Sequence, residues 1–142
     1  MARLPAEEAR RRFAAARVAR LATVSAAGLP HLVPVVFAVR DDLVVFAVDQ
    51  KPKRSADVRR VRNIADNPHV CLLADEYADD WSRLWWARAD GTATVVQAGP
   101  SREGALELLL DRYEQYRADP PRGPVVVVTV TRWSGWAHAS GG

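Results

Sequence analysis

Cysteine, lysine and long apolar stretches are scarce in this sequence of 142 residues. Because Cys71 is the single cysteine, an internal disulfide bond is excluded, and we expect a cytoplasmic protein. No apolar run approaches the roughly 18 residues of a membrane-spanning helix, so we expect no membrane partner. Residues 1–12 carry charges and no apolar core, so we expect no signal peptide.

The sequence also lacks the common signatures of a catalytic or metal site. His31, His69 and His138 are too widely spaced to match a zinc pattern, so we expect no metal. No Gly-x-Ser-x-Gly motif is present, and the carboxylates of residues 75–80 lack the spacing of a calcium loop. No catalytic residue can be assigned, and we expect any chemistry to belong to a bound cofactor.

The charge balance gives little support to nucleic-acid binding. Only two of the 20 basic residues are lysines, and the net charge is +3. Many arginines together with many alanines and valines are typical of a GC-rich genome. The acidic segment 75–80 offsets the local basic segment. We therefore expect no nucleic-acid partner.

Hydrophobic periodicity predicts one domain, residues 1–142, with both helices and strands. Helices are predicted over 5–18, 55–65 and 102–117. Strands are predicted over 20–25, 29–39, 43–48, 69–74, 84–96 and 125–130. Because neighbouring strands mostly follow one another without an intervening helix, the sheet should be mostly antiparallel. The predicted fold class is α+β, a mostly antiparallel six-stranded split β-barrel with flanking helices.

Pro34 lies inside a predicted strand, where it cannot donate a ladder hydrogen bond. The strand is therefore at an edge of the sheet or bulged. One interpretation is an ordinary edge proline. The other is that the backbone of residues 34–36 is left free for a flat ring.

Four of the five tryptophans occur in two close pairs. Trp85 and Trp86 are adjacent in a predicted strand, so they point to opposite faces. Only one can face the core, and the other is exposed, covers a ligand or enters a subunit interface, where tryptophan is favoured. The alternative is a strand packed on both sides. We expect Trp133 and Trp136 to cap the barrel or to reach across a dimer.

A basic segment follows the strand 43–48 and leads into the helix 55–65. It contains Lys51, Lys53, Arg54 and Ser55. Free N–H groups and the dipole at a helix start favour an anion, so the segment is a candidate phosphate site. The alternative is a solvated face of a short helix.

Three segments in this order resemble the pyridoxamine 5′-phosphate oxidase-like split-barrel superfamily. Residues 20–24 and 28–35 resemble its opening hairpin, with the sequences Arg-Leu-Ala-Thr-Val and Gly-Leu-Pro-His-Leu-Val-Pro-Val. Residues 62–70, Arg-Asn-Ile-Ala-Asp-Asn-Pro-His-Val, are similar to its next conserved segment. Residues 81–93 resemble a later strand of the branch that uses the deazaflavin F420.

The resemblance implies a homodimer with flavin or deazaflavin sites at the interface. It implies that Val35 and Val36 line the cofactor ring through their backbone, and that Asp49, Lys53 and Ser55 lie near the ribityl and phosphate groups. Lys51 and Arg54 of the same basic segment are also expected to bind the cofactor. It further implies that the basic helix contributes Arg60, Arg62 and Asn63, and that the partner strand contributes Trp85, Trp86 and Arg88.

The segment 50–57 looks longer than in many relatives, which favours F420 and its charged tail over FMN. The resemblance therefore implies an F420-dependent oxidoreductase that transfers a hydride between the deazaflavin and an unsaturated small organic substrate. Two alternatives stay open. One is an FMN-dependent oxidoreductase of the same fold, and the other is a non-catalytic carrier of flavin or F420.

Overall fold

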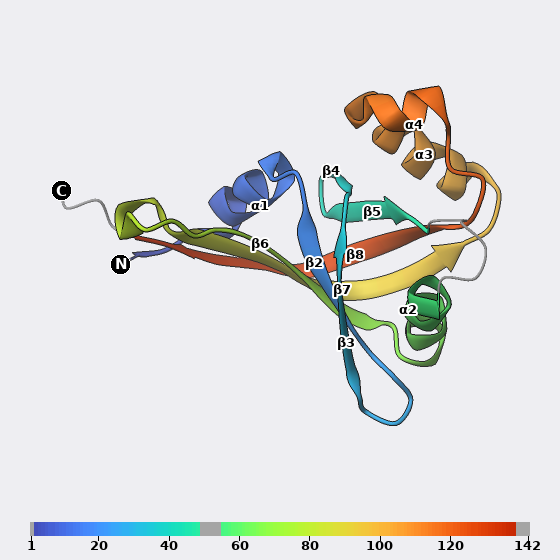
Figure 1. Ribbon diagram of the computed structural model, residues 1–142, viewed down its shortest axis with the longest axis horizontal. Helices are drawn as coiled ribbons and strands as arrows, with labels where there is room; N and C mark the ends of the chain where they lie inside the picture. The colour runs from blue at the N-terminus through green and yellow to red at the C-terminus, as the bar shows by residue number, and fades with distance from the viewer. Residues whose placement is uncertain (1, 49–54, 139–142) are drawn as a thin grey trace.

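The computed structural model describes residues 2–48 and 55–138. In this part of the chain, eight strands form one antiparallel sheet in the order β3-β2-β6-β7-β8-β5-β4, with β1 paired to β8 (Figure 1). The strands are β1 (Ala2–Arg3), β2 (Ala19–Val24), β3 (Pro30–Val35), β4 (Ala38–Arg40), β5 (Leu43–Ala47), β6 (His69–Glu76), β7 (Trp85–Val96) and β8 (Val125–Ala137). The sheet is open, because no ladder joins β3 to β4.

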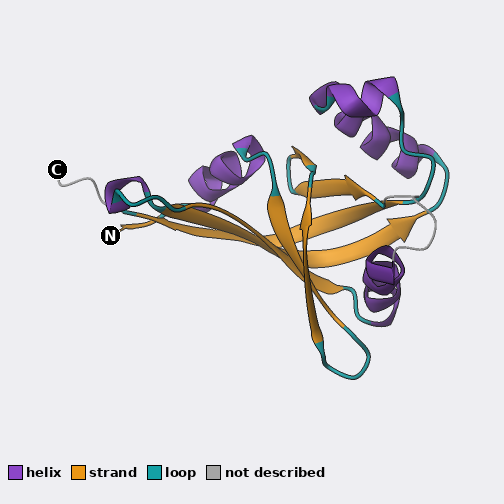
Figure 2. Ribbon diagram, viewed as in Figure 1, coloured by secondary structure: helices purple, strands orange, loops and turns teal. Residues whose placement is uncertain are grey.

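The helices lie around this sheet (Figure 2). They are α1 (Ala6–Ala15), α2 (Ser55–Asp66), α3 (Pro100–Arg112) and α4 (Glu114–Ala118), with a 3-10 turn η1 at Trp81–Arg83. The predicted α+β fold class, an antiparallel barrel-like sheet with flanking helices, is confirmed. The predicted helix 102–117 is two helices, because the chain is extended at Tyr113.

The strand count differs from the predicted six for local reasons. The predicted strand 29–39 divides into β3 and β4, with Val36 and Phe37 between them. The last strand continues through Trp133 and Trp136 to Ala137, so these tryptophans belong to the sheet. Pro34 was predicted to mark an edge or bulged strand, and the edge position is confirmed, because β2 is the only described strand that pairs with β3.

A glycine at the centre of β7 allows two long strands to approach closely. The pairing of β7 with β8 shifts register between Asp90 and Gly91. A Cβ on Gly91 would lie 2.2 Å from the carbonyl oxygen of Thr129, so no other residue fits without backbone movement. The first half of β7, from Trp85 to Asp90, pairs with the last parts of β6 and β8. Together these segments extend as an arm from the curled end of the sheet (Figure 1).

The main core contains an aromatic cluster under α1. Phe13 is completely buried, and its ring centroid lies 4.7 Å from that of Phe37 and 5.5 Å from that of Trp133. A second buried cluster lies under α3, where Leu109 packs with Val45 and Val125. The two clusters fix α1 and α3 on the sheet.

The aromatic cluster predicts a large effect of one truncation. Phe13→Ala should lower the free energy of unfolding by about 3–5 kcal/mol, because it leaves a cavity between two rings. Chemical denaturation measures this change. Tyr77→Ala, at a side chain that is 66% exposed, is the control and should change stability by less than about 0.5 kcal/mol. Equal effects of the two substitutions would contradict the described core.

Candidate functional site

The two faces of the arm differ in what they contact. A Cβ on Gly135 would approach Leu4 and Ala9, so this face of β8 is turned to α1. Trp85 lies on the same side, with Arg12 Cζ 5.9 Å from its ring centroid, and packs against the core. Trp86 points to the opposite face, where Arg88 Cζ lies 5.6 Å from its ring. One tryptophan of the pair therefore faces the core, as predicted.

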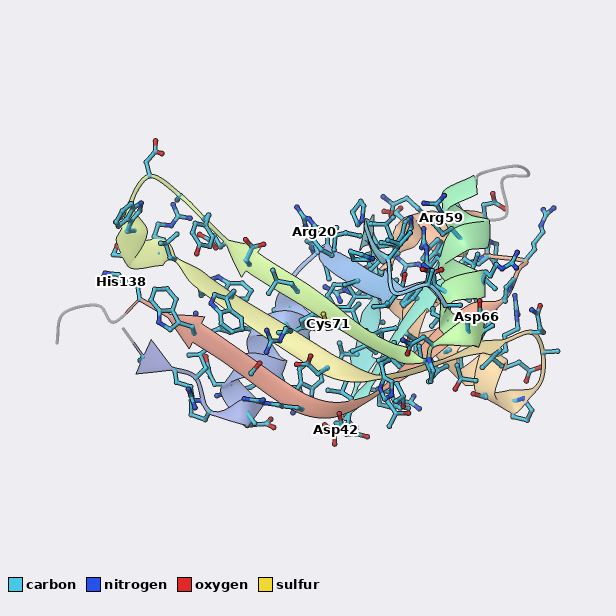
Figure 3. All side chains as sticks on the ribbon, turned by 90° about the horizontal axis from the view of Figure 1, so that it is seen from below. Arg20, Asp42, Arg59, Asp66, Cys71 and His138 are labelled. Atoms are coloured by element: carbon cyan, nitrogen blue, oxygen red, sulfur yellow. The ribbon has the colours of Figure 1, made fainter. Side chains whose placement is uncertain are left out.

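We call the face opposite α1 the open face, and it is turned to the viewer in Figure 3, where α1 lies behind the strands. It carries Trp86, Arg88, Ser134 and Trp136 on β7 and β8. Arg88 Nε donates to Asp90 Oδ2 at 3.0 Å. The Trp136 indole nitrogen and the Ser134 hydroxyl are buried and have no hydrogen-bond partner among the described residues. Such groups are costly unless something pairs with them.

Cys71 also lies on the open face, where it is half-buried and in register with Asp90. Burial, and secondly the charge of Asp90, raise the pKa of its thiol. The thiol is therefore protonated at neutral pH and is a poor nucleophile.

Val36 lies in the gap between two strand ladders. The β2–β3 ladder ends at the pair Ala19 and Val35, and the β4–β5 ladder begins at Ala38 and Val45. Val35 is buried in the core, whereas the Val36 side chain is 39% exposed. Both residues are expected to line a ring through their backbone, and Val36 is the one of the two whose side chain is also exposed.

The first pocket, here called the hairpin pocket, lies between α2 and the turn of the β2–β3 hairpin and has a volume of about 630 Å³. The predicted site residues Arg62 and Asn63 both line it. Asn63 is buried, and its Nδ2 donates to Thr23 Oγ1 at 3.1 Å, which attaches α2 to β2. Arg60, the third predicted residue of this helix, is buried and does not line the pocket.

Arg59 and His31 also line the hairpin pocket, and His31 was not predicted as a site residue. Arg59 lies one turn before Asn63 on α2, and His31 enters from β3 (Figure 3 shows Arg59 and Asp66 on α2). The buried Nδ1 of His31 has no partner among the described residues. Burial, followed by the charges of Arg59 and Arg60, lowers the pKa of His31. His31 is therefore neutral at neutral pH.

The hairpin pocket is positively charged overall. Arg59 and Arg62 are exposed and form no ion pair with another residue of the described ranges, and Asp66 is the one acid among the lining residues. Two guanidinium groups against one carboxylate favour an anionic ligand.

The second pocket, here called the helix-pair pocket, has a volume of about 660 Å³ at the junction of α3 and α4. It is lined by Arg17, Val36, Arg112, Tyr113, Glu114, Gln115, Tyr116 and Arg117. Val36 thus borders a hollow that also contains aromatic and cationic side chains. The hairpin pocket and the helix-pair pocket lie at opposite ends of β3.

Part of the predicted site cannot be placed. Asp49, Lys51, Lys53 and Arg54 lie outside the described residues, and Ser55 is the first residue of α2. Among the described residues, no group of three or more metal-binding side chains is found, and no helix is long and apolar enough to cross a membrane.

Comparison with known proteins identifies relatives of this fold. The profile of a family described as pyridoxamine 5′-phosphate oxidase matches residues 5–137. An FAD-binding protein from Mesorhizobium loti is 20% identical, with a TM-score of 0.72 over 94% of this chain and 95% of that chain. The FAD binding protein from Mycobacterium smegmatis is 20% identical, with a TM-score of 0.66 over 95% and 98%. A heme binding protein from Mycobacterium smegmatis is 22% identical, with a TM-score of 0.75 over 95% and 55%. No curated protein matches the sequence.

The environment of His31 makes stability depend on pH. Because its pKa is lowered in the folded state, the unfolded chain binds the proton more tightly. His31 therefore costs stability as the pH falls through its unfolded pKa of about 6.5. His31→Gln should reduce the loss of stability between about pH 7.5 and pH 5, as measured by denaturation at each pH.

His138→Gln, at an exposed position near the end of the arm, is the control for this experiment. It should keep the acid sensitivity of the wild type. If His31→Gln also keeps it unchanged, the described environment of His31 is wrong.

Proposed function

We propose that this chain, which belongs to the pyridoxamine 5′-phosphate oxidase family, is a dimeric oxidoreductase that holds a flavin-type cofactor along β3. The observation that carries the proposal is the meeting of Arg59, Arg62, Asn63 and His31 in one pocket at the start of the strand that ends beside Val36. Pro30 and Val36 are roughly 20 Å apart along an extended strand. An elongated ligand with an anionic end and a planar ring suits this arrangement.

The described residues fit such a cofactor at both ends. The guanidinium groups of the hairpin pocket would hold a phosphate or carboxylate, and the otherwise unpartnered Nδ1 of a neutral His31 would donate its N–H to the same anion. Val36 would contact the ring. The basic segment 49–54 precedes α2 directly in sequence and would add cations at the anionic end. When bound, the cofactor supplies two-electron redox chemistry to a small organic substrate, and the protein binds and orients both.

The choice of cofactor follows from the relatives and from the charges. Two related structures are of FAD-binding proteins, which supports a flavin as the first candidate. F420 is the second candidate, because two unneutralised arginines and the long segment 50–57 suit a charged tail. A third related structure is of a heme binding protein, so heme belongs in the test.

A second copy of the chain is part of the proposal because the two halves of the expected site lie apart. Pro34, Arg20, Leu73 and Arg88 follow one another across β3, β2, β6 and β7 in one register row. Three strand spacings separate Pro34 from Arg88, or about 14 Å. Within one chain, Arg88 and Trp86 therefore lie on a strand well away from Val36. Two chains that meet through their open faces would bring these residues together and give the buried groups of Ser134 and Trp136 a partner.

The first test is titration of the purified protein with FMN, FAD, F420 and hemin, followed by absorbance and fluorescence. Arg59→Gln with Arg62→Gln should weaken binding of the flavin or F420 by about tenfold, because two exposed charged contacts are lost. Arg10→Gln with Arg11→Gln removes the same charge from α1 and should leave binding unchanged. Tight binding of hemin without flavin or F420 would overturn the proposal, as would unaltered affinity of the Arg59 and Arg62 double variant.

The second test concerns the dimer. Arg88→Glu places a second acid beside Asp90 on the open face and should convert the dimer to a monomer in sedimentation experiments. Arg122→Glu reverses the same charge at a side chain that is 84% exposed in the segment before β8, and should leave the dimer intact. A wild-type monomer, or a dimer that persists in Arg88→Glu, would count against association through the open face.

A further inference from the structure

The backbone of Phe37 is held by the junction of α3 and α4 and not by a strand among the described residues. The Phe37 N–H donates to Tyr113 Oη at 3.0 Å, and the same hydroxyl donates to the Phe37 carbonyl at 2.6 Å. Arg112 Nη1 donates to this carbonyl as well, at 3.0 Å. Phe37 lies between two ladders, so these side chains supply hydrogen bonds that a neighbouring strand supplies elsewhere in a sheet.

Arg112 also fixes this junction to α1. Its Nη2 donates to the carbonyl of Ala16, which caps α1, and its Cζ lies 4.9 Å from the Phe37 ring centroid and 5.4 Å from that of Tyr113. One planar guanidinium thus joins the end of α1, the break after β3 and the end of α3. A lysine cannot reproduce this, because its single ammonium lacks the fork of donors.

Phe37 directly follows Val36, which is the exposed residue at the ring end of the proposed site. Val36 precedes Phe37, and its side chain borders the helix-pair pocket together with Arg112 and Tyr113. A valine between two ladders has no strand partner to fix its backbone. Its position therefore depends on the contacts of Phe37.

We propose that Arg112 and Tyr113 are positioning residues that place Val36 against the cofactor ring. This inference rests on the proposed function. It adds that the α3–α4 junction sets the position of the ring, whereas the phosphate contacts come from other residues. Tyr113 satisfies both backbone polar groups of one residue, Phe37, and Arg112 connects the Phe37 carbonyl to the end of α1. Loss of either contact lets Val36 move relative to the ring.

Tyr113→Phe and Arg112→Lys test the inference in the full chain. With the flavin or F420 that binds the wild type, each should raise the dissociation constant by about tenfold, because Tyr113→Phe removes two hydrogen bonds to Phe37 and Arg112→Lys removes the fork that joins Phe37 to Ala16. The absorption band of the bound cofactor should shift, because the ring environment changes. Hydrogen exchange at the Phe37 amide should become faster in Tyr113→Phe. Arg112→Gln should be more severe than Arg112→Lys, which retains the charge.

Arg102→Lys is the matched control. Arg102 also lies on α3 and donates to backbone carbonyls, those of Pro121 and Gly123, at 2.9–3.0 Å, but it does not line the helix-pair pocket. It should lose stability without a change in cofactor affinity or absorption. Equal effects at Arg102 and Arg112 would overturn the inference, because the role would then be structural.

The outcomes separate this inference from the proposed function. If the wild type binds neither flavin nor F420, both fail. If the wild type binds and folded Tyr113→Phe has the same affinity and absorption band, only the positioning role fails. If Tyr113→Phe does not fold, the comparison of Arg112→Lys with Arg102→Lys decides by the same two measurements.

Discussion

The structure depends on how the chain crosses from one edge of its sheet to the other at Val36 and Phe37. β3 and β4 stand at opposite ends of the strand order, yet only two residues separate them in sequence. Three peptide steps span at most about 11 Å, so the sheet must curl until its edges nearly meet. The bulge at Gly91 provides local bending in the longest strands. The split barrel is therefore a consequence of one short connection between distant edges.

That connection places backbone N–H and C=O groups in an apolar surrounding. The Phe37 ring is completely buried between α1 and the sheet, and its backbone N–H and C=O belong to no ladder of the described strands. A buried N–H or C=O without a partner would cost about 1–3 kcal/mol. Tyr113 and Arg112 remove this cost from 75 or more residues away in sequence. The same contacts explain why α3 ends at Arg112, with Tyr113 turned toward the break, and why a hollow forms where Val36 is exposed.

The sequence predicts most strands, the edge position of Pro34 and the opposite orientations of Trp85 and Trp86, because these depend on local alternation and on a missing donor. It does not predict the division of the strand 29–39, since Val35 to Val39 is continuously apolar and contains no turn residue. His31 was missed as a site residue because a single histidine carries no motif. Its place two residues before Val33, on the inward face of β3, was the available signal. The contact between Tyr113 and Phe37 leaves no trace in periodicity.

Arginine content alone says little about function in this chain, but carboxylate pairing separates the arginines into two groups. Within the described ranges, carboxylates neutralise the three arginines of α1 and three others further along the chain, namely Arg10, Arg11, Arg12, Arg83, Arg88 and Arg122. The arginines of the two pockets have no carboxylate partner in the part of the chain that the structure describes: Arg112 and Arg117, for example, donate to backbone carbonyls, which carry no formal charge. An arginine that its own chain leaves unneutralised beside a hollow attracts an anion more strongly than one paired on a surface. Such arginines lie beside a hollow at both ends of β3. A basic helix face that is merely solvated would not place them at both ends.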